Sequence, residues 1–347
     1  MKVAIATVNV PFIKGGAEIM TTELKKAFID CGYDAEIISI PFVFHPLKSV
    51  IDNVDYWRKQ DFNGFDIGRI DKVVSLKFPA YNLSHDNNTI WLMHQHRSIY
   101  DLYGTKFGEM RTADNDGLRN YIVETDNSAF NNARQIFTIS ENVSKRLEEF
   151  NGVASRPLYH PPKNADSFYN DGIFPYVYFP SRLELLKRQD LLISAMQHVA
   201  EPVIAIISGE GGEYENYKKL IKKLGLEHRI RLVGHVSHNQ MQRYYANCLA
   251  VFFGPYDEDY GYVSLEAMLS EKPVITCTDS GGVTEFVVNG ETGFVVKPEP
   301  VEIAEAINIA WADKAKAARL GKNAKELYLS KDINWRSVVS KLMGEKI

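Results

Sequence analysis

Strand-like and helix-like runs alternate along almost the whole chain of 347 residues, and this alternation constrains the fold most. Short runs rich in Val, Ile and Phe are followed by longer amphipathic stretches. Such alternation predicts parallel sheets with right-handed crossover connections. The expected strands are 3–9, 35–40, 72–76, 89–93, 135–139, 176–179, 203–208, 230–233, 249–254 and 273–277. The expected helices are 17–31, 142–151, 188–198, 214–224, 237–247, 264–270 and 300–312.

A break between His160 and Gly172 divides the alternation into two series. Two adjacent prolines and a polar run in this stretch are typical of a stiff, exposed linker. The chain length also fits two domains better than one. We therefore expect an α/β protein of two Rossmann-like domains, residues 1–165 and 166–332.

Two segments, 41–72 and 97–132, fit the alternation poorly and are rich in aromatic and charged residues. Long excursions from an α/β pattern are often substrate-binding segments. They are equally well explained as peripheral helices with ordinary aromatic packing. A membrane-contact face near residues 50–62, with Trp57 and Arg58 at the interface, is also left open.

Composition excludes several classes of protein. The net charge of −4 argues against a nucleic-acid binder, which needs a basic surface. The apolar amino terminus is short and reads as a first strand, not as a signal peptide. Of the three cysteines, Cys248 and Cys277 lie in apolar strand-like runs and are expected to be buried thiols. That favours a reducing, cytoplasmic location.

Glu258 and Glu266 flank a glycine at a predicted strand-to-helix turn. Two carboxylates at such a turn are suited to binding hydroxyl groups. The backbone amides of Gly261, Tyr262 and Val263, at the start of the helix, are suited to phosphate. For either glutamate alone, a simple preference of acidic residues for helix starts is a sufficient explanation.

Other loops carry groups suited to phosphate. Gly15 and Gly16 open a helix directly after the first strand, although such a pair is often only a turn. Arg182 and Lys187 follow the first strand of the second domain, at the sheet edge where open parallel sheets bind ligands. Solvated surface charge is the alternative for these two cations.

The run from Gly209 to Glu213 also follows a strand, but its glycines lack the spacing of a dinucleotide-binding fingerprint. A tight turn at Gly209 and Glu210 that contacts a nucleotide fits better. In the first domain, His94 and His96 follow a strand. A metal site is not expected here, because no matching cluster of His, Asp or Glu occurs elsewhere in the sequence. A histidine at this position is suited to binding a substrate hydroxyl, and the alternative is a buried core histidine whose ring nitrogens are hydrogen-bonded within the protein.

Together these motifs resemble the retaining glycosyltransferases of the GT-B fold, family four, also called glycosyl transferases group 1. The resemblance covers nearly the whole chain and is most specific in the carboxyl half. It is carried by Gly15-Gly16-Ala-Glu18, residues 140–146, Ser181-Arg182 with Lys187, Gly234-His-Val236, Glu258 with Glu266, residues 280–285 and residues 289–294.

The resemblance implies two Rossmann-like domains facing a central cleft, with a final helix within 333–347 packed on the first domain. It implies a nucleoside-diphosphate sugar as donor, with the diphosphate on Arg182, Lys187 and the Gly15 and Gly16 amides. Glu266 would hold the ribose and Glu258 the transferred sugar. Val236, Gly209 and Glu210 would meet the base, Gly261 to Val263 the sugar and phosphate. His94, better placed than His96, would approach the sugar.

The family retains anomeric configuration without a metal or cofactor, by same-face attack in which the leaving phosphate oxygen accepts the acceptor's proton. His94, Glu258, Arg182 and Lys187 are thus the expected catalytic residues. The acceptor implied is a glycan or a lipid-linked sugar in polysaccharide or lipopolysaccharide-type biosynthesis, which leaves open peripheral contact with the inner face of a membrane. A nucleotide-sugar epimerase or hydrolase of this fold, or a non-enzymatic sugar-binding protein, remains an alternative.

Overall fold

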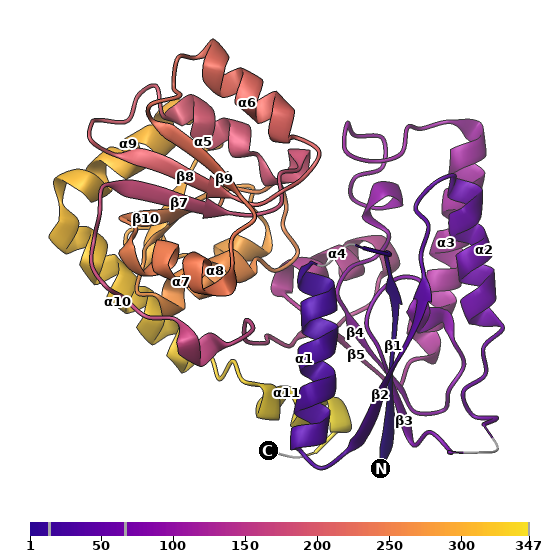
Figure 1. Ribbon diagram of the computed structural model, residues 1–347. Coiled ribbons are helices and arrows are strands. Elements are labelled where there is room, and N and C mark those ends of the chain that lie inside the picture. The colour runs from indigo at the N-terminus through magenta and orange to yellow at the C-terminus, as the bar shows by residue number, and fades with distance from the viewer. Residues whose placement is uncertain (13–14, 66–67, 346–347) are drawn as a thin grey trace. The chain divides into compact units, whose positions relative to one another are not determined.

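The computed structural model describes residues 1–12, 15–65 and 68–345. Its contacts divide the chain into two compact units (Figure 1). Unit 1 comprises Met1–Lys163 and Asn334–Ile347, and unit 2 comprises Asn164–Ile333. The division falls within the linker expected between His160 and Gly172. The chain returns to unit 1 at Asn334, one residue after the start of the final segment expected at 333–347.

Unit 1 is built on a parallel sheet of six strands in the order β2-β1-β3-β4-β5-β6. The central strands are apolar and buried, as expected for a sheet with both faces covered. Their bounds are β1 Lys2–Asn9, β2 Asp34–Pro41, β3 Lys72–Ser75, β4 Asn88–Leu92, β5 Gln135–Thr138 and β6 Arg156–Pro157.

Helices cover both faces of this sheet (Figure 1). They are α1 Gly16–Asp30, α2 Leu47–Arg58, α3 Ala113–Asn132, α4 Glu141–Asn151 and, from the end of the chain, α11 Trp335–Met343. α11 packs against α1, which returns the carboxyl-terminal segment to the first unit. The final helix expected from the family resemblance is therefore present.

The two excursions contain helices α2 and α3, which pack on each other as peripheral helices, while a substrate-binding role for these segments stays a prediction. Arg58 Nη1 donates to the Tyr121 hydroxyl over 3.0 Å across this pair. The proposed place of Trp57 at a membrane interface is wrong, because its side chain is fully buried. Its spacing from Val50 and Val54 puts all three on the inward face of α2.

Unit 2 contains a second parallel sheet, in the order β12-β11-β10-β7-β8-β9. Its strands are β7 Tyr176–Pro180, β8 Ile204–Ser208, β9 Ile230–Gly234, β10 Ala250–Phe252, β11 Val274–Cys277 and β12 Gly293–Val296. Cys248 and Cys277 are both buried, as predicted from their apolar surroundings. The short strand β12 was not among the expected strands.

Figure 1 shows α5, α6 and α9 on one face of this sheet and α7, α8 and α10 on the other. Their bounds are α5 Gln189–Ala195, α6 Tyr214–Lys223, α7 His238–Asn247, α8 Tyr262–Leu269, α9 Pro300–Ala312 and α10 Lys314–Ser330. α8 begins two residues before the expected start, because Gly261 in the left-handed region forms its N-cap. α10 was not predicted.

The strand order of each unit reverses once, and this fixes where a ligand can sit. In unit 2 the chain proceeds from β7 to β8 and β9 on one side, then returns to β10 on the other side of β7. In unit 1 the corresponding reversal lies between β1 and β3. Open parallel sheets bind ligands at such switch points, outside the carboxyl ends of the strands.

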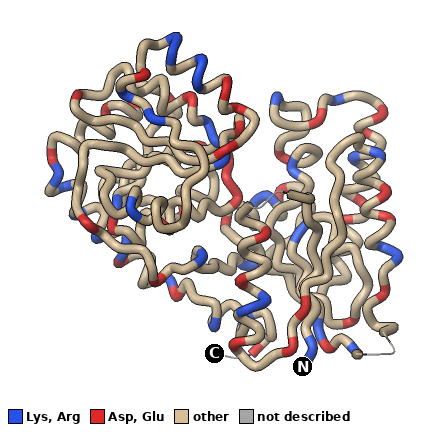
Figure 2. Tube along the Cα trace, viewed as in Figure 1, with Lys and Arg blue, Asp and Glu red and all other residues tan. Residues whose placement is uncertain are grey.

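Lys and Arg positions alternate with Asp and Glu positions along the described backbone of each unit (Figure 2). Within residues 1–12, 15–65 and 68–345, no helix is both long enough and apolar enough to cross a bilayer.

Candidate functional site

Lys187 and Glu258 meet at the switch point of unit 2. Lys187 ends the turn after β7, and Glu258 lies in the loop after β10, the strand beside β7. Lys187 Nζ donates to Glu258 Oε2 over 2.6 Å, with the side chains 14% and 21% exposed. Both remain accessible enough to contact a ligand. The sequence predicted each of them, and the topology brings them together.

The loop that carries Glu258 is held by the segment after β11. The Glu258 amide donates to the Ser280 carbonyl over 3.3 Å, and the Gly282 amide donates to the Glu258 carbonyl over 2.8 Å. A Cβ on Gly282 would lie 2.6 Å from the Asp259 carbonyl oxygen, so this close approach requires glycine. The Ser280-Gly-Gly motif thus fixes the backbone of Glu258.

Glu266 lies in the second turn of α8 and is anchored from α7. The fully buried Tyr245 donates its hydroxyl to Glu266 Oε2 over 2.6 Å. Burial raises the pKa of Glu266 to about 7, although the hydrogen bond from Tyr245 acts in the opposite direction. The carboxylate therefore changes charge near neutral pH. Tyr245 was not predicted, because nothing in a helical tyrosine signals a distant partner.

Gly261 precedes α8 with φ of 87°, a conformation that favours glycine. A Cβ there would lie 2.8 Å from a methyl carbon of Val283, which makes a side chain doubly unfavourable. This geometry directs the chain so that Tyr262 and Val263 form the first turn of α8. Their amides lie at the helix end that carries partial positive charge.

Arg182 also follows β7, as predicted, and its side chain is half exposed. Its Nη1 lies 2.7 Å from Glu184 Oε1 in an ion pair at the surface. Its backbone carbonyl accepts from the buried Gln189 side chain over 2.8 Å. The backbone position of Arg182 is therefore fixed while its guanidinium remains near solvent.

Gly209 and Glu210 pack directly on the turn after β7. The Glu210 carbonyl accepts from the Leu183 amide over 2.9 Å, and the Gly209 amide donates to the Gly234 carbonyl over 2.8 Å. Gly209 has φ of 130°, and a Cβ there would overlap the Ser181 carbonyl at 1.9 Å. Packing alone thus explains this glycine. The half-buried Val236 lies two residues beyond Gly234.

In unit 1, Gly15 is the N-cap of α1, and its amide donates to Glu18 Oε2 over 2.9 Å. Lys77, which follows β3, lies 3.3 Å from Glu18 Oε1. Burial alone would raise the pKa of Glu18, but Lys77 and the backbone hydrogen bonds outweigh it and lower the pKa. The Gly15 amide is thus hydrogen-bonded to Glu18, and Gly16 is the first residue of α1.

The two histidines after β4 have different surroundings. His96 is buried and stacks on Phe78 at 5.1 Å between ring centres, and burial lowers its pKa to about 4. The interpretation as a core histidine is correct for His96. His94 is half-buried, and its Nδ1 lies 2.6 Å from the Gln95 carbonyl oxygen.

Arg188 is a further residue at the switch point of unit 2, which the sequence pattern predicts only as the start of a helix. Its guanidinium contacts the carbonyls of Gly254 and Pro255 and both oxygens of Asp279. The only available signal was a third cation directly after Lys187 in the turn.

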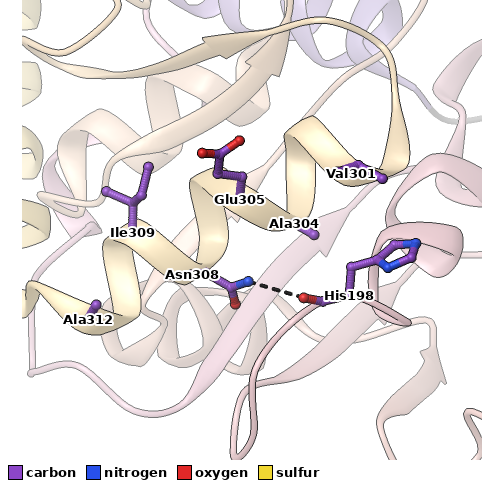
Figure 3. A pocket seen from close by; sticks show the side chains of 7 residues that line it. All are labelled: His198, Val301, Ala304, Glu305, Asn308, Ile309 and Ala312. Atoms are coloured by element: carbon purple, nitrogen blue, oxygen red, sulfur yellow. Dashed lines mark hydrogen bonds between the residues drawn. The ribbon is translucent and has the colours of Figure 1, made fainter.

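A pocket of about 440 Å³ lies elsewhere on unit 2, along α9 (Figure 3). There Asn308 Nδ2 donates to the His198 carbonyl over 3.1 Å. None of the predicted site residues lines it; its lining is His198, Val301, Ala304, Glu305, Asn308, Ile309 and Ala312. Among the residues whose structure is described, no group of three or more His, Cys, Asp or Glu is arranged to hold a metal ion.

Comparison with known sequences adds a family to this geometry. Residues 166–327 match the model of the family described as glycosyl transferases group 1. An uncharacterized glycosyltransferase of Methanocaldococcus jannaschii is 28% identical over 221 residues, which cover 61% of this chain and 58% of that protein. The alpha-1,3/1,6-mannosyltransferase ALG2 of Dictyostelium discoideum is 32% identical over 112 residues, 32% of this chain and 26% of that protein. The chain thus spans less than two thirds of these relatives.

Solved structures share the fold over nearly the whole chain. HepE of Anabaena, solved with UDP and glucose, has a TM-score of 0.72 at 20% identity and covers 99% of both chains. Sucrose-phosphate synthase of Thermosynechococcus elongatus has a TM-score of 0.78 at 18% identity and covers 99% of this chain and 97% of that one. Residues 166–327 of unit 2 thus match the glycosyl transferases group 1 family, in a chain that has the GT-B fold.

Proposed function

We propose that this protein is a retaining, metal-independent glycosyltransferase. It would move a hexose-type sugar from a nucleoside-diphosphate sugar to a glycan or lipid-linked acceptor. The observation that carries the proposal is the pairing of Lys187 with Glu258 at the switch point of a group 1 domain. A cation and a carboxylate side by side suit a ligand that has a diphosphate next to sugar hydroxyls.

The cations would stabilise the leaving group. A departing nucleoside diphosphate develops negative charge, which Lys187, Arg182 and the helix amides at Tyr262 and Val263 would stabilise. Glu258 is better suited to binding sugar hydroxyls than to nucleophilic attack, because Lys187 already holds its Oε2 at 2.6 Å. A retaining glycosidase would instead need a second carboxyl group about 5 Å away as its acid.

The nucleoside would lie toward Glu266. Its carboxylate would accept hydrogen bonds from the ribose hydroxyls, with the base near Gly209, Glu210 and Val236. The contributions of Gly16 and His94 from unit 1 rest on the family resemblance. A lipid-linked acceptor would place the reaction at the inner face of a membrane, which the protein would reach from the cytoplasm.

A thermal-shift panel of UDP, GDP and ADP, with their glucose or mannose derivatives, tests the donor class. A ligand at one hundred times its Kd stabilises the folded state by about 2.7 kcal/mol. We expect one nucleotide series to raise the unfolding midpoint, and to do so equally in the presence of EDTA. No shift with any nucleotide would overturn the proposed donor class, and a shift abolished by EDTA would overturn metal independence.

A further inference from the structure

Arg188 joins three segments of unit 2 through its side chain. It follows Lys187 directly and forms the N-cap of α5. Its Nε donates to the Gly254 carbonyl over 2.8 Å and its Nη2 to the Pro255 carbonyl over 2.9 Å. The same guanidinium binds both oxygens of Asp279, from Nη1 over 2.8 Å and from Nη2 over 2.6 Å. The Arg188 side chain is 13% exposed, while Asp279 is 35% exposed.

Both segments that Arg188 contacts determine the position of Glu258. Gly254 and Pro255 begin the loop that leads to Glu258. Asp279 is followed by Ser280, whose carbonyl accepts from the Glu258 amide. The backbone adds two parallel ties, since the Tyr256 amide donates to the Leu186 carbonyl over 2.8 Å and the Asp257 amide to the Asp279 carbonyl over 2.9 Å.

The backbone of Arg188 disfavours an arginine. Its φ of 54° and ψ of 45° lie in the left-handed region, which glycine adopts without steric cost and other residues adopt rarely. Whatever Arg188 contributes therefore comes from its side chain and not from its local conformation. A planar guanidinium has five donors in a fixed fork and can bind two carbonyls and both oxygens of a carboxylate together, whereas an ammonium has only three donors.

We propose that Arg188 is a positioning residue, which fixes the Glu258 loop relative to Lys187 so that the carboxylate meets the transferred sugar while the ammonium meets the diphosphate. This inference rests on the proposed function. Arg188 itself would touch neither sugar nor phosphate. It would act through the Gly254–Pro255 carbonyls and Asp279, and its loss would affect binding of the sugar more than binding of the nucleoside diphosphate.

The test compares R188G with wild type by titration calorimetry against UDP, UDP-glucose, GDP and GDP-mannose. Glycine relieves the left-handed backbone while it deletes the side chain, so the variant separates stability from positioning. We expect the relieved backbone to offset part of the cost of the lost hydrogen bonds, so that the variant still folds. We also expect the affinity for the sugar nucleotide to fall about tenfold relative to that for the free nucleoside diphosphate, the effect of losing one charge-assisted hydrogen bond.

Three further variants keep the test decisive. R188K retains the charge but not the forked guanidinium, and D279N weakens the contact between Arg188 and Asp279. Both variants are therefore expected to lower the ratio of the affinity for the sugar nucleotide to that for the free nucleoside diphosphate, as R188G does. K325Q removes the ion pair of Lys325 with Glu271 elsewhere in unit 2 and should leave the ratio unchanged. If R188K or D279N, the two clamp variants, folds, the affinity ratio can still be measured even if R188G does not fold.

An unchanged ratio in the folded clamp variants would overturn the positioning role. Equal losses of both ligands with a lowered unfolding midpoint would also overturn it, because Arg188 would then be purely structural. If none of the four nucleotides binds the wild-type protein, it is the donor class in the proposed function that fails, and this result is distinct from the other two.

Discussion

Lys187 Nζ and Glu258 Oε2 lie 2.6 Å apart, although 71 positions separate the two residues in the chain. Each follows a strand, and the two strands, β7 and β10, are neighbours only because the strand order reverses between them. The pair therefore lies at the carboxyl edge of the sheet, where open parallel sheets bind ligands. Because the pair combines a cation with a carboxylate, substitutions at and around it test the proposed site in unit 2.

Replacing Lys187 with Met should lower kcat/KM about 10²-fold to 10³-fold, the effect of removing one group that stabilises developing charge. Methionine keeps most of the apolar stem but loses the ammonium, which lies 5.8 Å from the centre of the Phe253 ring. The measurement is steady-state transfer from the sugar nucleotide that the protein binds. K325M, which removes the lysine of the Glu271 ion pair, is the matched control and should retain its activity. Equal activity in K187M and K325M would remove Lys187 from the phosphate site.

Replacing Tyr245 with Phe should weaken ribose recognition selectively. The variant loses the hydroxyl that holds Glu266 Oε2, which costs about 1 kcal/mol, or roughly fivefold in affinity. We expect this loss for UDP but not for 2′,3′-dideoxyuridine diphosphate, which lacks the hydroxyls that Glu266 would bind. Y176F deletes a hydroxyl that donates to the Tyr244 carbonyl and serves as the control. Equal losses for both nucleotides would contradict a ribose role.

Nucleotide binding should depend on the charge of Glu266. Its pKa of about 7 means that the carboxyl group is protonated in much of the unliganded protein at pH 6 and ionised at pH 8. Ribose hydroxyls donate to the ionised form, so affinity should rise as the pH increases through 7 and then level off. Calorimetry from pH 5.5 to 8.5 measures this slope. E266Q is the control for titration of the nucleotide itself, and the same slope in E266Q would exclude Glu266 as its source.

Substituting Ala for Gly209 should destabilise unit 2 by at least about 3 kcal/mol, because the new Cβ overlaps the Ser181 carbonyl and the backbone has φ of 130°. Gly212 is in the same loop, and a Cβ there meets nothing within 4 Å. G212A should therefore stay within about 0.5 kcal/mol of wild type. Denaturant unfolding measures both. A mild effect of G209A would mean that the loop after β8 is free to move away from the turn after β7.

Periodicity was sufficient to predict the two parallel sheets and the linker, because buried strands such as β1 and β8 are continuous apolar runs. Periodicity failed where a segment lacks a clear contrast between apolar and polar residues. The short strand β12 begins with Gly293, whose Cβ position is occupied by the Val274 carbonyl, so glycine here marks close packing and not a turn. The helix α2 was obscured by Trp57, an aromatic residue that belongs to the buried face.

The site was predicted as a set of separate loops, and Lys187 and Glu258 were recognised because charged residues after strands are informative. The residues that support them were not. Arg188, Asp279 and Tyr245 act through partners at least 21 positions away in the chain, and no local pattern encodes such contacts. Gly209 was interpreted as a nucleotide contact, whereas its packing against Ser181 already requires a glycine.

The most direct test of the proposed function is product analysis after incubation of the protein with α-linked sugar nucleotides, candidate glycan and lipid-linked acceptors, and EDTA. Mass spectrometry counts the glycosylated acceptor, and NMR assigns its anomeric configuration. We predict one glycosylated acceptor for each nucleoside diphosphate released, with the new linkage in the α configuration. Release of free sugar, an epimerised nucleotide sugar or a β-linked product would contradict retaining transfer.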